Sequence, residues 1–187
     1  MEVDVLNDAR VGADIERSGG VRCGIGLKSI YEIECRSADG QTKWCETVEN
    51  LVVNTGLDDA LDKYFKGSAY TAAHYVGLTA GTPTIAAGDT MASHAGWTEV
   101  AAYSEAVRQT LTLGAVTGQS VDSSASKASF SINTNNTTIG GAFITTNNTK
   151  SGATGTLYGA AAFSAGNKLA DNGDTVNVTV TLTFSAV

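Results

Sequence analysis

Residues 175–184 read TVNVTVTLTF and alternate polar and apolar side chains without a break. Because successive side chains of a β-strand point to opposite faces, this period of two predicts a strand with one face in a core and the other in water. The apolar face would carry Val176, Val178, Val180, Leu182 and Phe184. A fold that contains such a strand needs a second layer to cover this face.

A predicted hairpin lies nearer the start, where residues 29–37 (SIYEIECRS) and 41–53 (QTKWCETVENLVV) flank Ala38-Asp39-Gly40. Asp-Gly between alternating segments predicts a two-residue type I′ turn, which pairs Ala38 with Gln41 and Cys35 with Trp44. Cys35 and Cys45 then leave opposite faces, which excludes a disulfide between them. The core face would hold Tyr31, Ile33, Cys35, Trp44 and Val48, and the outer face Glu32, Glu34, Arg36, Lys43 and Cys45.

One helix is predicted over residues 56–66 (GLDDALDKYFK), with Asn54 or Thr55 as its cap and Gly67 at its end. Its apolar residues form a single stripe, which we expect to be buried against one end of the fold. The stripe consists of Leu57, Leu61, Tyr64 and Phe65.

Further strands are predicted at 107–113, 127–133, 139–145 and 154–163, joined by loops rich in Gly, Ser, Asn and Thr. Within one strand, Gly140-Gly141 indicates a bulge or a close backbone approach. Many short strands with turn-rich connections indicate a mainly β, antiparallel sandwich or jelly roll over residues 26–187.

The long stretch from Tyr75 to Arg108 begins with a strand signal and continues as a loop around Pro83, the only proline. Loops of this length in a compact domain are usually functional. We expect a structural loop containing Asp89, His94, Trp97 and Glu99. Trp97 should be buried with its indole N–H bonded, and Asp89 should accept backbone N–H bonds.

His74, just before this stretch, and Asp89, His94 and Glu99 within it are the only cluster that could hold a metal or transfer protons. Their spacing matches no ligand signature, and Ser93 beside His94 is not a catalytic triad. We expect no catalytic residue, no cofactor and no metal.

Residues 1–25 are predicted to be an extended arm, because their scattered charges leave too little apolar surface to fold alone. Two interpretations stay open: a floppy terminus, or a strand that is added to a partner's sheet. The candidate contacts with a neighbouring subunit are Leu6, Val11, Ile15, Cys23 and Cys45, with free thiols favoured over intermolecular links.

Composition excludes several classes of protein. A net charge of −7 argues against nucleic acid as a partner. No apolar run is long enough to span a membrane, and the acidic start does not resemble a signal peptide. The cysteine spacing matches no zinc pattern.

Several short motifs follow one another between about residues 40 and 160. They are Gly40 and Trp44, Asn50-Leu51-Val52, Gly56-Leu57, Tyr75-Val76-Gly77-Leu78, Ala87-Gly88-Asp89-Thr90, His94, Gly96-Trp97, Glu99, Tyr103, Arg108 and Gly141-Ala142-Phe143. This ordered set resembles small virion structural proteins encoded in the head or tail gene clusters of tailed bacteriophages. The resemblance implies a non-enzymatic shell or tail component, and residues 1–25 lie outside it.

Three functions were compared. The first is a capsid decoration (cement) protein, a homo-oligomer on the outer capsid surface that binds the major capsid protein lattice. The second is a tail-fibre, baseplate or head-fibre component whose Thr/Asn-rich face binds host glycan. The third, a hydrolase or metal enzyme, requires Asp89, His94 and Glu99 to converge, and it is the least favoured.

Overall fold

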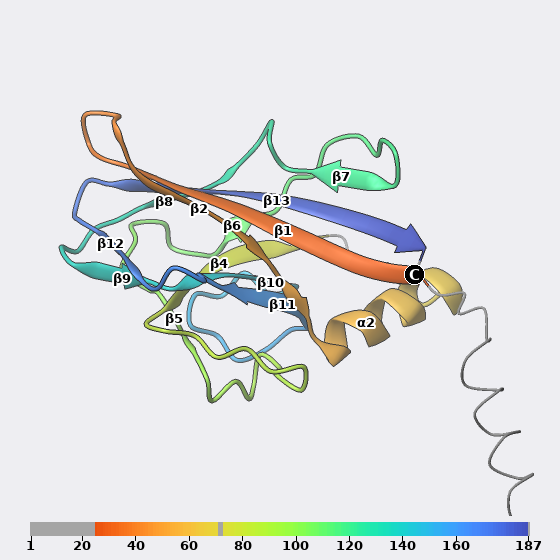
Figure 1. Cartoon of the computed structure of the whole chain (residues 1–187). Coiled ribbons are helices and arrows are strands. Elements are labelled where there is room, and N and C mark those ends of the chain that lie inside the picture. Colours follow the sequence, from red (N-terminus) through yellow and green to blue (C-terminus); the bar gives the residue numbers. More distant parts are fainter. Residues whose placement is uncertain (1–24, 71–72, 187) are drawn as a thin grey trace, which may run out of the picture.

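A computed structural model describes residues 25–70 and 73–186 and shows a mainly β protein built from two large antiparallel sheets and one small two-stranded sheet (Figure 1). The first sheet contains β1 (Ile25–Arg36), β2 (Thr42–Glu49), β7 (Ser120–Asp122), β8 (Ala128–Ser131) and β13 (Thr175–Ala186). The second contains β3 (Leu51–Val52), β4 (Tyr75–Ala80), β5 (Thr98–Glu99), β6 (Gln109–Thr110), β10 (Gly141–Thr145) and β11 (Leu157–Ala162). The predicted sandwich-like class is confirmed, and the jelly-roll connection stays a prediction.

The main core lies between the two sheets. From the first sheet, β1 and β13 contribute facing pairs, among them Ile33 with Val178 and Tyr31 with Val180, and all four side chains are fully buried. Val76 and Leu78 of the second sheet belong to the same cluster. The alternation predicted for residues 175–184 is therefore confirmed at its first three apolar positions.

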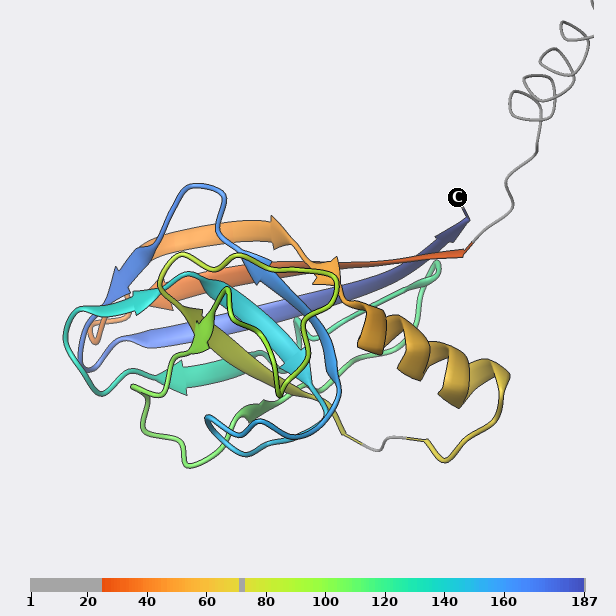
Figure 2. The same ribbon diagram turned by 90° about the horizontal axis from the view of Figure 1, so that it is seen from below.

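The last two apolar positions of β13 differ from this prediction. Leu182 is only half-buried, and Phe184 remains 53% exposed. Figure 2 shows the reason, because β1 and β13 run past the end of the second sheet. The alternation continues there, but no strand of the second sheet lies opposite it.

The predicted hairpin forms with the expected faces but with a different turn. Cys35 does pair with Trp44, and Cys45 is exposed on the outer face. The type I′ turn is wrong, because only Gly40 in this turn has a positive φ, +84°. Its N–H bonds the Ser37 carbonyl at 2.8 Å, which gives a three-residue loop followed by a bulge.

The bulge also corrects the predicted position of Lys43. Arg36 pairs with Thr42, so Lys43 is the extra residue in the strand. Its ammonium bonds Asp174 at 2.6 Å and Asp171 at 2.9 Å, instead of extending from the outer face. These hydrogen bonds to carboxylates raise the pKa of Lys43.

The predicted helix is present, but the side of it that packs against the sheet is not the apolar stripe. The helix comprises α2 (Asn54–Ala60) and a π-helical turn, η1 (Leu61–Phe65), and Gly56 is its buried residue. A Cβ at Gly56 would collide with the Tyr158 backbone, so a glycine allows the helix to approach β11 closely. The expected burial of the apolar stripe is wrong, since Leu57, Leu61, Tyr64 and Phe65 are all exposed.

The ends of the helix also differ in detail. Neither Asn54 nor Thr55 caps it, because the N-cap is Val53 and makes no side-chain bond. The Thr55 hydroxyl instead donates to the Leu157 carbonyl at 2.8 Å. Gly67 ends the helical segment with a φ of +79°, which suits its predicted role.

Three short strands lie between the predicted strands, except that Ile139, the last residue of one of them, belongs to the strand predicted at 139–145. They are β7, β9 (Thr137–Ile139) and β12 (Lys168–Ala170), of which β9 and β12 pair with each other. Each is three residues long, and its partner lies far away in sequence, so no local pattern indicates it. The predicted close approach at Gly140-Gly141 is confirmed, because a Cβ at Gly140 would collide with the Gly81 carbonyl and one at Gly141 with the Ala161 carbonyl.

Residues 1–24, which hold most of the predicted arm, lie outside the described residues, and β1 already includes Ile25. Within the described ranges, no helix is long and apolar enough to cross a membrane.

Candidate docking surface and the central loop

We call residues 81–108, which join β4 to β6 and include β5, the central loop. It covers the face of the second sheet that points away from the main core (Figure 1). Met91 and Trp97 from the loop pack with Phe143 of β10 and Leu157 of β11 in a second buried cluster. As a result, β10 is buried on both faces along its whole length. The loop is thus a layer of the fold.

Trp97 is the anchor of this layer. It is 5% exposed, and its indole N–H donates to the Asp89 carboxylate at 3.0 Å. Asp89 also accepts the Ala86 backbone N–H at 3.1 Å. His94 stacks on the indole with ring centroids 3.8 Å apart, and its Nδ1 lies 2.9 Å from the Trp97 carbonyl oxygen. The predicted burial of Trp97 and the predicted bonds of Asp89 are confirmed.

A buried ion pair holds the end of the loop. Arg108 donates Nε to Glu99 Oε1 at 3.0 Å and Nη2 to Oε2 at 2.7 Å, and its side chain is completely buried. The same guanidinium also donates to the carbonyls of Asn147 and Gly152, at 2.9 and 2.8 Å. Because all these acceptors are in place, the charge is paired in the interior.

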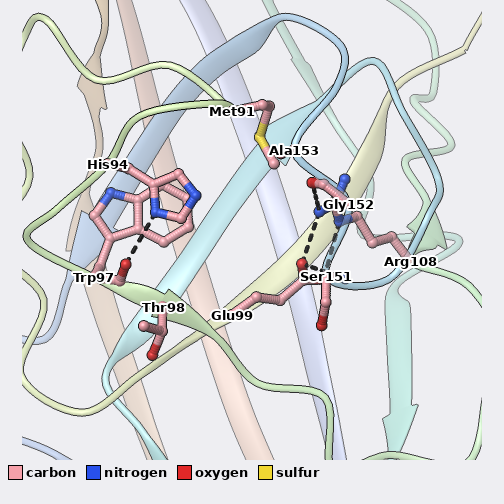
Figure 3. A pocket seen from close by; sticks show the side chains of 9 residues that line it. All are labelled: Met91, His94, Trp97, Thr98, Glu99, Arg108, Ser151, Gly152 and Ala153. Atoms are coloured by element: carbon pink, nitrogen blue, oxygen red, sulfur yellow. Dashed lines mark hydrogen bonds and ion pairs between the residues drawn. The ribbon is translucent and has the colours of Figure 1, made fainter.

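Sequence reasoning named Glu99 but missed its pairing with Arg108. One signal was available, since Arg108 is the only arginine after Arg36 and follows Glu99 by nine residues. Figure 3 shows the two side chains together, with the Ser151 N–H donating to Glu99 at 2.9 Å. The bond joins the loop to the 146–153 connection, which no local pattern predicts.

A small cavity of about 240 Å³ lies between His94 and Arg108 (Figure 3). The polar groups around it already bond one another: His94 to the Trp97 carbonyl, and Glu99 to Arg108. Of the four predicted candidates, His74 lies elsewhere, edge-on to the Tyr158 ring at 4.8 Å. In the described part of the chain, no three His, Cys, Asp or Glu side chains come together as metal ligands. The central loop therefore has the geometry of a structural element.

A different surface leaves apolar side chains exposed in the described part of the chain. An apolar groove of about 490 Å³ lies at the end of the sandwich where β1 and β13 outrun the second sheet. Its walls come from three parts of the chain: the strand ends, the segment after β6 and the side facing the helix. They include Leu27 and Phe184, Leu113 and Val116, and Tyr70 and Tyr158.

Next to the groove, the helix presents its apolar stripe to solvent. We call the exposed side chains Leu57, Leu61, Tyr64 and Phe65 the ridge, and the ridge and the groove together the apolar end. Tyr64 is 83% exposed and Phe65 67%, and their rings contact each other edge to face with centroids 5.1 Å apart. Tyr70, 79% exposed, follows the helix and lines the groove.

The two described cysteines lie in different environments, and both are free. Cys35 is buried, and burial raises the pKa of its thiol to about 12, with the nearby Asp174 carboxylate adding to the shift. Cys45 is exposed on β2, as a contact with a neighbouring subunit would require. The other candidate contacts, Leu6, Val11, Ile15 and Cys23, lie outside the described residues.

Comparison with known proteins adds no relative: no family model, curated protein or solved structure matches this chain.

Proposed function

We propose that this protein is a non-enzymatic virion structural protein that decorates the outer capsid surface and binds the major capsid protein lattice. The observation that supports this proposal is the apolar end, where a helix ridge and a groove of about 490 Å³ leave large apolar side chains uncovered. Contiguous apolar surface of this kind marks sites that another protein or a membrane covers.

The character of the apolar end favours a protein partner. Its exposed side chains include three aromatics, Tyr64, Phe65 and Tyr70, which are the residue types that dominate the centres of protein interfaces. The helix that carries the ridge bears both signs of charge, with Asp62 paired to Lys66 at 3.1 Å. An anionic membrane surface would instead favour a run of Lys and Arg on such a helix.

The body that presents this surface is suited to a passive structural task. In the central loop, Glu99 pairs with Arg108 and Trp97 bonds Asp89, and these contacts hold the loop closed over the sheet. A rigid body with one apolar end gives a decoration protein a fixed shape and a defined contact with another virion protein, the capsid lattice or a sister subunit. Residues 1–25 are proposed as a second attachment, an extended segment that adds to a partner's sheet.

Binding to purified heads tests the proposal. The full chain, mixed with heads that lack it, should sediment with them and occupy sites in the hundreds per particle. A variant without residues 1–22 should remain folded by circular dichroism but bind heads at least about tenfold more weakly. Unchanged affinity of this variant would show that residues 1–22 are not an attachment.

The same experiment separates the head from the tail. Labelled protein should be found on heads in negative-stain images, and copy numbers in the tens on tails would support the fibre or baseplate alternative instead. No binding to either would contradict the proposed function.

A further inference from the structure

The apolar end begins as a continuation of the core face. Leu27 lies opposite Phe184 in the register of β1 and β13. This pair is two residues beyond the pair formed by Ser29 and Leu182, so it lies on the same face of the sheet. Side chains on this face are buried further along the same strands, where Tyr31 and Val180 contact the second sheet. Leu27 and Phe184 therefore lie on the core face of the sheet, and no described strand packs over that face at this end.

The exposed area is larger than single scattered residues would leave. Three aromatic rings that are 83%, 67% and 79% exposed present together on the order of 350–550 Å², at the 150–250 Å² typical of each ring. The largest apolar patch of a typical monomer is about 300–600 Å². Leu57, Leu61, Val116 and Phe184 add to this area, which brings the apolar end close to the roughly 800 Å² per partner of a stable interface.

We propose that the apolar end is a self-association surface, on which a second copy of this chain packs about a two-fold axis. The ridge of each copy would fill the groove of the other. This inference rests on the proposed function only in treating the apolar end as a protein-binding surface, and it names a sister subunit as the occupant.

The shape of the apolar end supports a second copy. One molecule carries both a convex apolar element, the ridge, and a concave one, the groove. They are neighbours, because Ala60 of the helix that carries the ridge also lines the groove. A two-fold contact uses the same patch on both subunits, so each ridge-to-groove contact occurs twice. A partner with only one of these elements would leave the other exposed.

The charges of the helix permit such a contact. It carries three acidic residues, Asp58, Asp59 and Asp62, and two basic ones, Lys63 and Lys66. Asp59 bonds the Tyr158 hydroxyl, and Asp62 is paired with Lys66. Repulsion between two copies of the helix is therefore small, although the whole chain carries a net charge of −7.

Sedimentation equilibrium of the full chain under reducing conditions tests the inference. The wild-type protein should sediment as a dimer. The ridge variant Tyr64→Ser/Phe65→Ser and the groove variant Val116→Asp should each raise the dissociation constant at least about 100-fold, because buried aromatic anchors dominate interface energies. All three replaced side chains are exposed in the single chain, so both variants should keep the wild-type unfolding midpoint at protein concentrations too low for the wild type to dimerise.

Leu169→Ser is the matched control, because Leu169 is 52% exposed on β12 and lies outside the apolar end. It should leave the dimer unchanged. A wild-type chain that stays monomeric up to about 0.1 mM would overturn the inference. So would a dimer that neither the ridge variant nor the groove variant weakens. Head binding by a monomeric chain would leave the proposed function standing, and a dimer that binds no heads would contradict that function alone.

Discussion

The central loop and the apolar end contain similar side chains in opposite situations. In the loop, Trp97 is 5% exposed and its N–H is bonded, whereas Tyr64 on the ridge is 83% exposed. The loop has a sheet beneath it and folds onto that sheet, while no described segment covers the outer side of the ridge. Residue type alone therefore does not distinguish a structural aromatic from a docking one; the presence of a covering layer does.

The largest expected effect is the loss of the Trp97 side chain. Trp97→Ala should lower the free energy of unfolding by about 3–5 kcal/mol, because it leaves a cavity between the loop and β10 and removes the bond to Asp89. Tyr64→Ala, the matched change on the ridge, should alter it by less than about 0.5 kcal/mol when both variants are measured at concentrations where the chain is monomeric. Urea denaturation measures both, and equal effects would abolish the distinction between the two regions.

Breaking the buried ion pair should have the next largest effect. Glu99→Gln should cost about 3 kcal/mol, the low end for breaking a buried pair, because the amide oxygen still accepts one bond from Arg108. The matched control is Glu49→Gln, whose partner Lys28 is exposed and whose loss should cost about 0–1 kcal/mol. Similar denaturation midpoints for the two variants would contradict this prediction, because they would show that water reaches the Arg108–Glu99 pair as it reaches the Lys28–Glu49 pair.

A glycine under the central loop gives a smaller effect. Gly77 lies opposite Phe143, and a Cβ there would collide with the Phe143 ring. Gly77→Ala should therefore cost about 1–3 kcal/mol through overpacking. Gly88→Ala, in the loop itself, has open space around its Cβ and should change stability by less than about 0.5 kcal/mol. Thermal unfolding of both variants checks this contrast.

The smallest expected effect is a pH dependence at the groove. His74 lines the groove, and burial lowers its pKa below the ordinary value of 6.5, against the opposing effect of Asp59. The unfolded chain therefore takes up a proton first as the pH falls through about 6.5, so stability is present above that pH and declines below it. His74→Phe keeps an aromatic ring beside Tyr158 and should flatten the decline between about pH 7 and pH 5. An unchanged slope in urea midpoints would contradict this assignment.

Several features of the fold were predictable because they depend on neighbours in the sequence. Strict alternation over residues 175–184 is a local property, and it correctly indicates a strand whose Val176, Val178 and Val180 are buried. The predicted pairing of Cys35 with Trp44 is correct because the bulge at Lys43 offsets the one-residue shift that the different turn introduces. The bonds that Asp89 accepts from Ala86 and Trp97 arise within a few residues, whereas the burial of Trp97 also requires Phe143 and Leu157 from the sheet beneath it.

The remaining features depend on segments that are distant in sequence. The stripe on the helix predicts amphipathic packing, but the tertiary structure turned Gly56 toward β11 and left Leu61 and Tyr64 in solvent. The alternation of β13 cannot reveal that the second sheet ends before Phe184. The partners that Arg108 meets across the 146–153 connection are equally invisible in a local pattern. Local periodicity determines which face of an element is apolar, whereas long-range packing decides whether another layer covers that face.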